Sequence, residues 1–160
     1  MKMRPLVLAG FLLLAATSTA SAAIPDGLQS FAGNWSCVLK SGGSTYLSSA
    51  ANAVWGSWIK EEITFPAQMG QPASVGTAYL GYDAGTHNWI YNEIDSVGEY
   101  FITKSASPQV SNSSWTSAFP VAGDSSAIRV ASRSEYTVDG SYTENGKKSS
   151  FHQTCTRKAD

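Results

Sequence analysis

The side chains that could do chemistry in this chain are few and lie far apart. The 160 residues contain two histidines, His87 and His152, and two cysteines, Cys37 and Cys155. Two histidines leave few ways to build a Ser-His-Asp triad, and no Gly-x-Ser-x-Gly nucleophile elbow occurs. The cysteines do not form a Cys-x-x-Cys pair, and no histidine lies at ligand spacing from them. The sequence therefore predicts no catalytic residue, no metal site and no cofactor.

Two pairs of carboxylates are close together along the chain. Glu61 and Glu62 are adjacent, and adjacent side chains of a strand point to opposite faces, so they cannot act together on one substrate. Glu93 and Asp95 share a face, but Asp95 begins a turn, where an aspartate commonly accepts backbone hydrogen bonds. We therefore expect a protein that is not an enzyme, and a hydrolase with paired carboxylates is the alternative.

The first residues have the pattern of a secretory signal peptide. Lys2 and Arg4 precede an apolar run over residues 6–16, and Ala20-Ser21-Ala22 offers a small-residue cleavage site. We predict a signal peptide over residues 1–22, no retained membrane anchor, and export to the periplasm or outside the cell. Removing Lys2 and Arg4 changes the formal net charge from −1 to −3. A mildly acidic chain without a basic cluster disfavours nucleic acid as a partner.

Alternation of apolar and polar residues with a period of two dominates the rest of the chain. It predicts about eight strands, over residues 33–40, 54–65, 75–82, 88–94, 99–105, 115–119, 128–138 and 149–158. Residues 41–53, rich in Ser, Gly and Ala, are predicted to be a loop, with a turn of helix over 48–54 as an option. Short turns between the strands predict one all-β domain over 33–158, a single antiparallel up-and-down barrel that follows an N-terminal segment over 23–32.

The two cysteines predict how such a barrel closes. In an exported chain they most simply form one disulfide, and here it would join the first strand to the last. An even number of strands makes these two strands antiparallel neighbours. If Cys37 lies opposite Cys155, then Trp35 lies opposite Arg157 on the same face. A guanidinium group over that indole ring would form a cation–π contact.

Gly33-Asn34-Trp35 matches the Gly-x-Trp signature at the start of the first strand of lipocalins and the wider calycin barrels. In that family an arginine of the last strand packs across this tryptophan, and the predicted register puts Arg157 there. The chain also resembles secreted bacterial lipocalin-like domains, with Gly81-Tyr82-Asp83 before a strand that bears a tryptophan. Neither the Thr-Asp-Tyr segment of many lipocalins nor a C-terminal helix before the last strand is present.

The resemblance implies a barrel that holds one small, mostly apolar molecule as its partner. Glu61 or Glu93 would then supply polar contacts. The strand over 88–94 leaves open which of its two faces points inward. A barrel filled by its own side chains, acting as a structural or protein-interaction module, is the alternative. The candidate ligand-binding residues are Trp35, Trp58, Tyr79, Trp89, Tyr91, Phe101 and Tyr136.

The late histidine His152 also resembles the iron ligand of haem-binding barrels of the nitrobindin type. His152 alternates out of phase with Cys155, however, which puts it on the face opposite Trp35. The glycine-rich repeat that follows the tryptophan in that family is missing here. We therefore expect no haem, and we expect His87, which follows a turn, to be solvated.

Overall fold

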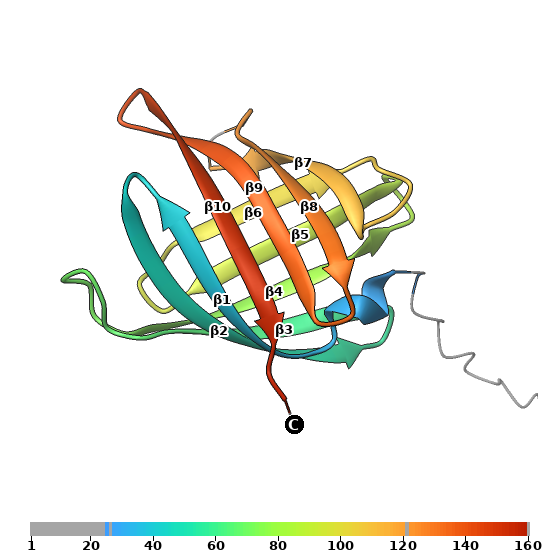
Figure 1. Cartoon of the computed structure of the whole chain (residues 1–160). Helices are drawn as coiled ribbons and strands as arrows, with labels where there is room; N and C mark the ends of the chain where they lie inside the picture. The colour runs from blue at the N-terminus through green and yellow to red at the C-terminus, as the bar shows by residue number, and fades with distance from the viewer. Residues whose placement is uncertain (1–24, 26, 121, 160) are drawn as a thin grey trace, which may run out of the picture.

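The computed structural model describes residues 25, 27–120 and 122–159, so the predicted signal peptide over residues 1–22 lies outside the described residues. Ten antiparallel strands form a closed barrel, in which each strand pairs with the next and β10 pairs with β1 (Figure 1). This confirms the predicted all-β up-and-down barrel. The strands are β1 (Gly33–Ser41), β2 (Ser44–Trp55), β3 (Trp58–Phe65), β4 (Ser74–Asp83), β5 (Asn88–Asp95), β6 (Tyr100–Ser105), β7 (Asn112–Phe119), β8 (Ser125–Ser132), β9 (Glu135–Glu144) and β10 (Lys147–Arg157).

The barrel has ten strands rather than about eight, and the first of the missed strands is β2. It occupies most of residues 41–53, which were predicted to be a loop. Ala and Ser have low strand propensity and do not alternate visibly in polarity, so their pattern did not indicate a strand. Gly42 and Gly43 have φ angles of +57° and +82° and make the tight turn that leads back into β2. A turn of this kind needs residues that tolerate positive φ.

The second missed strand results from a turn that is marked by serines alone. The predicted strand over 128–138 covers only the second half of β8 and the beginning of β9, which are joined by a turn at Arg133 and Ser134. The Ser132 hydroxyl accepts a hydrogen bond from the backbone N–H of Ser134 at 3.1 Å. Neither Gly, Pro, Asn nor Asp marks this turn, so the sequence showed one strand. Ten strands are still an even number, and the first and last strands remain antiparallel neighbours.

The closing seam of the barrel has the predicted register. Cys37 and Cys155 form a disulfide between β1 and β10 across a sequence separation of 118. Trp35 lies opposite Arg157, and the Cζ atom of that arginine is 4.5 Å from the centroid of the Trp35 ring. The predicted disulfide and the predicted cation–π contact are both confirmed.

Arg157 also explains why a glycine begins β1. Its guanidinium group donates hydrogen bonds to the backbone carbonyl oxygens of Ser30 at 2.9 Å and of Ala32. Its Nε donates to the carbonyl oxygen of Arg133 at 2.8 Å. A Cβ at Gly33 would collide with this guanidinium group, and Gly33 has a φ of +116°. Only glycine combines that backbone conformation with the close approach.

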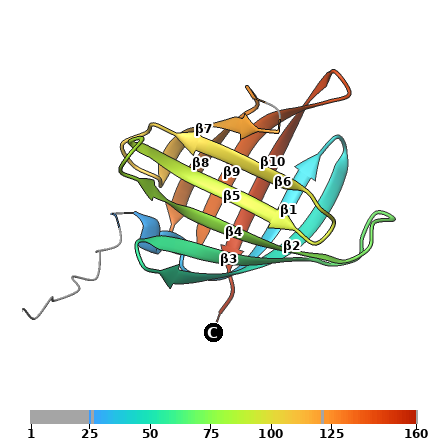
Figure 2. The ribbon, with the colours of Figure 1, turned by 180° about the vertical axis from the view of Figure 1, so that it is seen from behind.

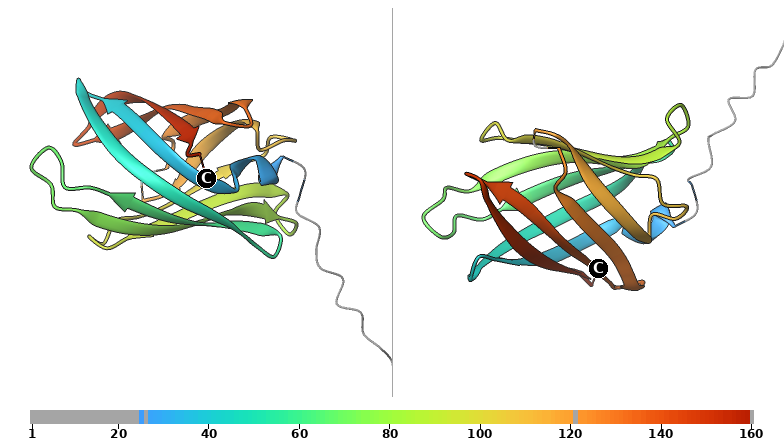
Figure 3. Two further views of the ribbon diagram at one scale, coloured as in Figure 1. Left: turned by 60° about the horizontal axis from the view of Figure 1, so that its bottom comes forward. Right: turned by 90° about the horizontal axis from the view of Figure 1, so that it is seen from above.

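A short 3-10 helix, η1 (Leu28–Phe31), lies beside one end of the barrel (Figure 3). Leu28 and Phe31 are buried in the same core cluster as Trp35. The Nε1 of Trp35 donates a hydrogen bond to the carbonyl oxygen of Phe31 at 2.8 Å. The predicted N-terminal segment over 23–32 therefore contains the residues that close this end.

Candidate functional site

The inner wall of the barrel has two halves that differ in exposure. Near η1 the inward-facing aromatic side chains are packed: Trp35, Trp115 and Trp89 are 1 %, 2 % and 4 % exposed, and Tyr136 is 8 % exposed. We call this end the packed half. Toward the other end the side chains that follow them on the same face remain partly exposed, and we call this end the open half. Its partly exposed apolar side chains are Leu39, Tyr46, Phe65, Phe101, Val138, Tyr142 and Phe151.

The rim of the open half is hollowed where β1 and β10 end their pairing. A hollow of about 530 Å³ lies between the turn at Gly42 and Gly43 and strands β9 and β10. It is lined by Ser41 and Phe151, which belong to the inner face, and by His152, which belongs to the outer face. Its other lining residues include Lys40, Thr45 and Asp139 of the outer face, so the hollow lies across the rim of the barrel wall.

Five of the seven predicted ligand-binding residues lie on the inner face. The pairing of β4 with β5 places Leu80 opposite Tyr91 and Ala78 opposite Glu93, and both Leu80 and Ala78 are buried. Trp89, Tyr91 and Glu93 therefore point inward, which decides between the two faces of the strand over 88–94. The five inward residues are Trp35, Trp89, Tyr91, Phe101 and Tyr136.

The prediction that Trp58 and Tyr79 point inward was wrong. Trp58 pairs with Gly81 on the outer face, where a Cβ at residue 81 would collide with the indole ring. An aromatic ring that covers a glycine of the neighbouring strand is a common way to protect that backbone. Tyr79 packs against Trp55 on the same outer face, with ring centroids 5.3 Å apart.

A row of inward-facing residues crosses the strands where the packed half meets the open half. Asn52, Glu61, Ala78, Glu93 and Phe101 lie opposite one another in turn, from β2 to β6. Figure 2 shows β3 to β6 side by side in this wall. The small side chain of Ala78 separates the two glutamates, which leaves room for both carboxyl groups on the inner side.

Tyr91 connects the two carboxyl groups. Its hydroxyl lies 2.7 Å from Oε2 of Glu93 and 3.3 Å from Oε2 of Glu61. A tyrosine hydroxyl carries one proton, so it can donate fully to only one of the two carboxyl groups. The shorter distance assigns that hydrogen bond to Glu93.

Burial dominates the electrostatics of this pair. It raises the pKa of Glu61 to about 7, with a further rise from the charge of Glu93, and Tyr91 and Asn52 lower it in part. Burial likewise raises the pKa of Glu93 to about 7, and the hydrogen bond from Tyr91 opposes this rise. A carboxyl group with a pKa near 7 is partly protonated at neutral pH.

Asn52 adds a buried acceptor to the same row. Its Nδ2 donates a hydrogen bond to the carbonyl oxygen of Phe31 at 3.0 Å, and only the amide nitrogen can make this bond. The Oδ1 atom of Asn52 therefore points away from the carbonyl oxygen of Phe31. It is buried and has no hydrogen-bond partner among the described residues, and Asn52 as a whole is 9 % exposed.

Sequence reasoning missed Asn52 because it lies in β2, which was predicted to be a loop. No sequence signal distinguished it, since Ser and Ala surround it on both faces. Glu61 and Glu93 were expected as polar contacts of a ligand, but not as neighbours that share one hydroxyl group.

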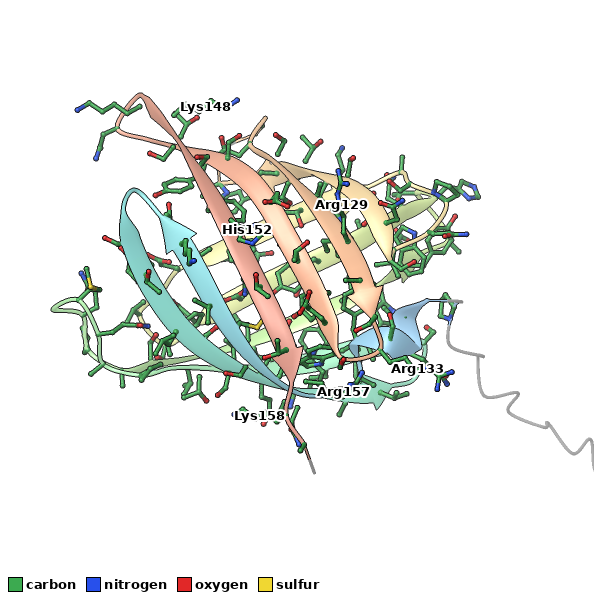
Figure 4. All side chains as sticks on the ribbon, in the orientation of Figure 1. Arg129, Arg133, Lys148, His152, Arg157 and Lys158 are labelled. Atoms are coloured by element: carbon green, nitrogen blue, oxygen red, sulfur yellow. A yellow bond between two sulfur atoms is a disulfide. The ribbon has the colours of Figure 1, made fainter. Side chains whose placement is uncertain are left out.

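A second cluster lies on the outer wall. His152 contacts Asp139 through Nδ1 at 2.6 Å and Thr154 through Nε2 at 3.1 Å, and Figure 4 shows His152 midway along β10. The order of these groups is that of a hydrolase relay. In the described part of the chain, however, the backbone N–H groups of β10 beside Thr154 pair with β1 and β9 and are not free to form an oxyanion hole. The predicted position of His152, on the face opposite Trp35, is confirmed.

Among the described residues, no group of three or more His, Cys, Asp or Glu side chains is arranged to hold a metal ion. The same part of the chain contains no helix that is long and apolar enough to cross a membrane.

Comparison with known proteins gives a fold likeness alone. No family model and no curated protein matches the chain. Among solved structures it is similar to a redesigned β barrel, with 12 % sequence identity over 82 % of this chain and 95 % of that one, at a TM-score of 0.48. The class of the protein therefore follows from its own strand pairing, which is that of a closed antiparallel up-and-down barrel with ten strands.

Proposed function

We propose that this protein is an exported, non-enzymatic barrel that binds a small, mostly apolar molecule in its open half. The observation that carries the proposal is that apolar side chains on the inner wall of the open half remain partly exposed, whereas those of the packed half are buried. Apolar surface in contact with water costs free energy, and a ligand that covers it gains about 25 cal/mol per Å². The disulfide suits an oxidising compartment outside the cytoplasm.

The packed half supports this function because it holds one end of the barrel in a fixed arrangement. The disulfide, the contacts of Arg157 and the helix η1 all hold the end of the barrel that lies below the open half. A wall that is ordered before binding loses little entropy when the ligand arrives.

The arrangement of Gly33, Trp35 and Arg157 supports a similarity to the lipocalin-like barrels. In those proteins the same three residue types close one end of the barrel and leave the other for a ligand. Nucleic acid is not expected as a partner, because the exported chain is mildly acidic.

One observation favours the alternative of a protein-interaction module. Ile94, Tyr100 and Phe119 are large apolar side chains that are exposed on the outer wall, and the rings of Tyr100 and Phe119 lie 5.3 Å apart. Contiguous exposed apolar side chains often mark an interaction surface. This alternative predicts binding to the outer wall, independent of the inner one.

Native mass spectrometry of the protein purified from its host tests the proposed function first, because a bound molecule would be retained. A titration with the neutral fluorophore N-phenylnaphthylamine then compares two matched variants. Ser48 faces inward opposite Cys37, and Ser49 faces outward on the same strand. We expect Ser48→Phe to weaken binding about tenfold by filling the open half, and Ser49→Phe to leave it unchanged. Equal effects of the two variants, or no binding by the original protein, would contradict the proposal.

A further inference from the structure

We propose that the ligand is a small amine, with an apolar body and a protonated nitrogen that binds Glu61, Glu93 and the Oδ1 of Asn52. This inference rests on the proposed function and specifies the chemistry of its ligand. It follows from the hydrogen-bonding groups, the charges and the aromatic side chains at the boundary of the packed and open halves.

The inner wall has more hydrogen-bond acceptors than donors at this boundary. Two carboxyl groups and the unpartnered Oδ1 of Asn52 belong to this row, and the donors there are the hydroxyl of Tyr91 and the amide nitrogen of Asn52, which lies opposite Glu61. A buried acceptor without a donor is costly, and the Nδ2 bond to Phe31 prevents Asn52 from turning its amide around. A primary ammonium group offers three donors in a small volume, which suits such a set of acceptors.

Among the residues that the structure describes, no cation forms an ion pair with these carboxyl groups. Among the described residues the ion pairs are Lys60 with Glu62 and His152 with Asp139, and both pairs lie on the outer wall. Arg157, the cation at the packed end, directs its donors to backbone carbonyl oxygens instead. A ligand cation would gain from this field, and a ligand carboxylate would be repelled.

The surroundings of the two glutamates also suit an amine. The ring of Tyr91 lies 5.7 Å from that of Phe101, and this pair borders Glu93. Aromatic faces attract a cation and cover the apolar part of a ligand. The absence of a side chain at Gly76 lets Oε1 of Glu93 lie close to the β4 backbone, since a Cβ there would be only 3.3 Å from that oxygen.

The test uses three ligands that share one apolar body and differ in the end group: phenylbutylamine, phenylbutanol and phenylbutyrate. Isothermal titration calorimetry with the full exported chain near pH 7.5 measures each affinity. We expect the amine to bind about tenfold or more tighter than the alcohol, as is typical of a charged hydrogen bond, and the acid to bind weakest. The amine affinity should fall as the pH is lowered from about 8 to 5, because the carboxyl groups then hold their protons.

Three variants locate the effect. Glu61→Gln and Glu93→Gln should each remove most of the preference for the amine and leave the affinity for phenylbutanol within about twofold. Glu62→Gln is the matched control, since Glu62 follows Glu61 on the same strand and faces outward, and it should keep the preference. Thermal unfolding of each variant checks that the barrel is intact, and two independent inner variants keep the test decisive if one fails to fold.

The outcomes separate this inference from the proposed function. If phenylbutanol binds in the open half and the amine binds no tighter, the amine inference is overturned and the binding function stands. If Glu62→Gln removes the preference as strongly as Glu93→Gln, the effect belongs to the general surface charge, and the inference is again overturned. Displacement of the amine by calcium ions at equal concentration would indicate a metal-cation site in its place. If none of the three ligands binds and the purified protein retains no molecule, both proposals fail.

Discussion

The two halves of the barrel are built from the same ten strands, yet their inward-facing side chains differ in exposure. In the packed half three tryptophans and Tyr136 meet under the helix η1 and exclude water. In the open half smaller and polar residues, such as Ser48 and Thr103, share the wall with partly exposed aromatic side chains. Alternation along a strand divides its side chains into two sets that point to opposite faces. The size of those side chains and the presence of a cover decide whether the inside is filled.

The difference also separates stability from function. Burial of large side chains and the contacts of Arg157 concentrate the packing free energy at one end. The carboxyl groups of Glu61 and Glu93, which are partly buried, lie at the boundary, where they cost stability and form the proposed binding site. Polar groups that reduce stability are commonly kept because they act on a ligand.

The largest expected effect is the loss of the central tryptophan of the packed half. Trp35→Ala should lower the free energy of unfolding by about 3–5 kcal/mol, because it removes a fully buried side chain and the partner of Arg157. Phe101→Ala, in the open half, should cost less than about 2 kcal/mol because Phe101 is already partly exposed. Chemical denaturation measures both. Equal losses would show that the two halves are packed alike.

Removing the disulfide should have the next largest effect. The double variant Cys37→Ser with Cys155→Ser should lose about 2–4 kcal/mol of stability under oxidising conditions, because the bond closes a long loop in the unfolded chain. The barrel should still form, as shown by an unchanged far-ultraviolet circular dichroism spectrum. With a reducing agent present, the original protein should unfold at the denaturant concentration of the variant; if it does not, the bond contributes little.

Two glycines compare the ends of the barrel directly. Gly33→Ala should cost about 2–3 kcal/mol, because a Cβ would collide with Arg157 and the φ of +116° is unfavourable. Gly43→Ala, in the turn at the open rim, has a φ of +82° but meets no atom within 4 Å. It should cost about 1 kcal/mol, from backbone strain alone. Equal unfolding temperatures of the two variants would contradict tight packing around Gly33 in the packed half.

The pH dependence of stability should reveal the buried carboxyl groups. The pKa values of Glu61 and Glu93 are raised to about 7 in the folded protein from an ordinary value of 4.5. Between these values the folded state holds more protons than the unfolded state. Stability should therefore decrease by up to about 5 kcal/mol for the two groups together as the pH rises from about 4.5 to 7, since each pH unit costs up to about 1.4 kcal/mol per group.

Other groups near this pair must be considered in the same measurement. Tyr91 and Asn52 lower the pKa of Glu61, and the charges of Asp95 and Glu99 raise that of Glu93. The double variant Glu61→Gln with Glu93→Gln should remove the decrease, and Glu62→Gln should retain it. A decrease that persists in the double variant would assign it to other groups.

Much of the candidate site could not be predicted from the sequence, for identifiable reasons. The strand over 88–94 carries aromatic or aliphatic residues on both faces, so its alternation did not distinguish the inside from the outside. Trp58 has the size and polarity of a core residue, and only its pairing with Gly81 of the neighbouring strand places it on the outer face. Asn52 lay in a stretch of Ser and Ala whose strand character depends on its two neighbours, β1 and β3.

By itself the sequence determined the class of fold, the disulfide, the register of the closing seam and the contact of Arg157 with Trp35. These follow from the local alternation of apolar and polar residues and from the two cysteines, which can form only one disulfide with each other. Only the tertiary structure decided that there are ten strands, which aromatic side chains point inward, and that half of the barrel is packed. It also brought Glu61, Glu93 and Asn52 together. Each of these depends on which strands lie side by side across the barrel, and residues far apart in the chain set that arrangement.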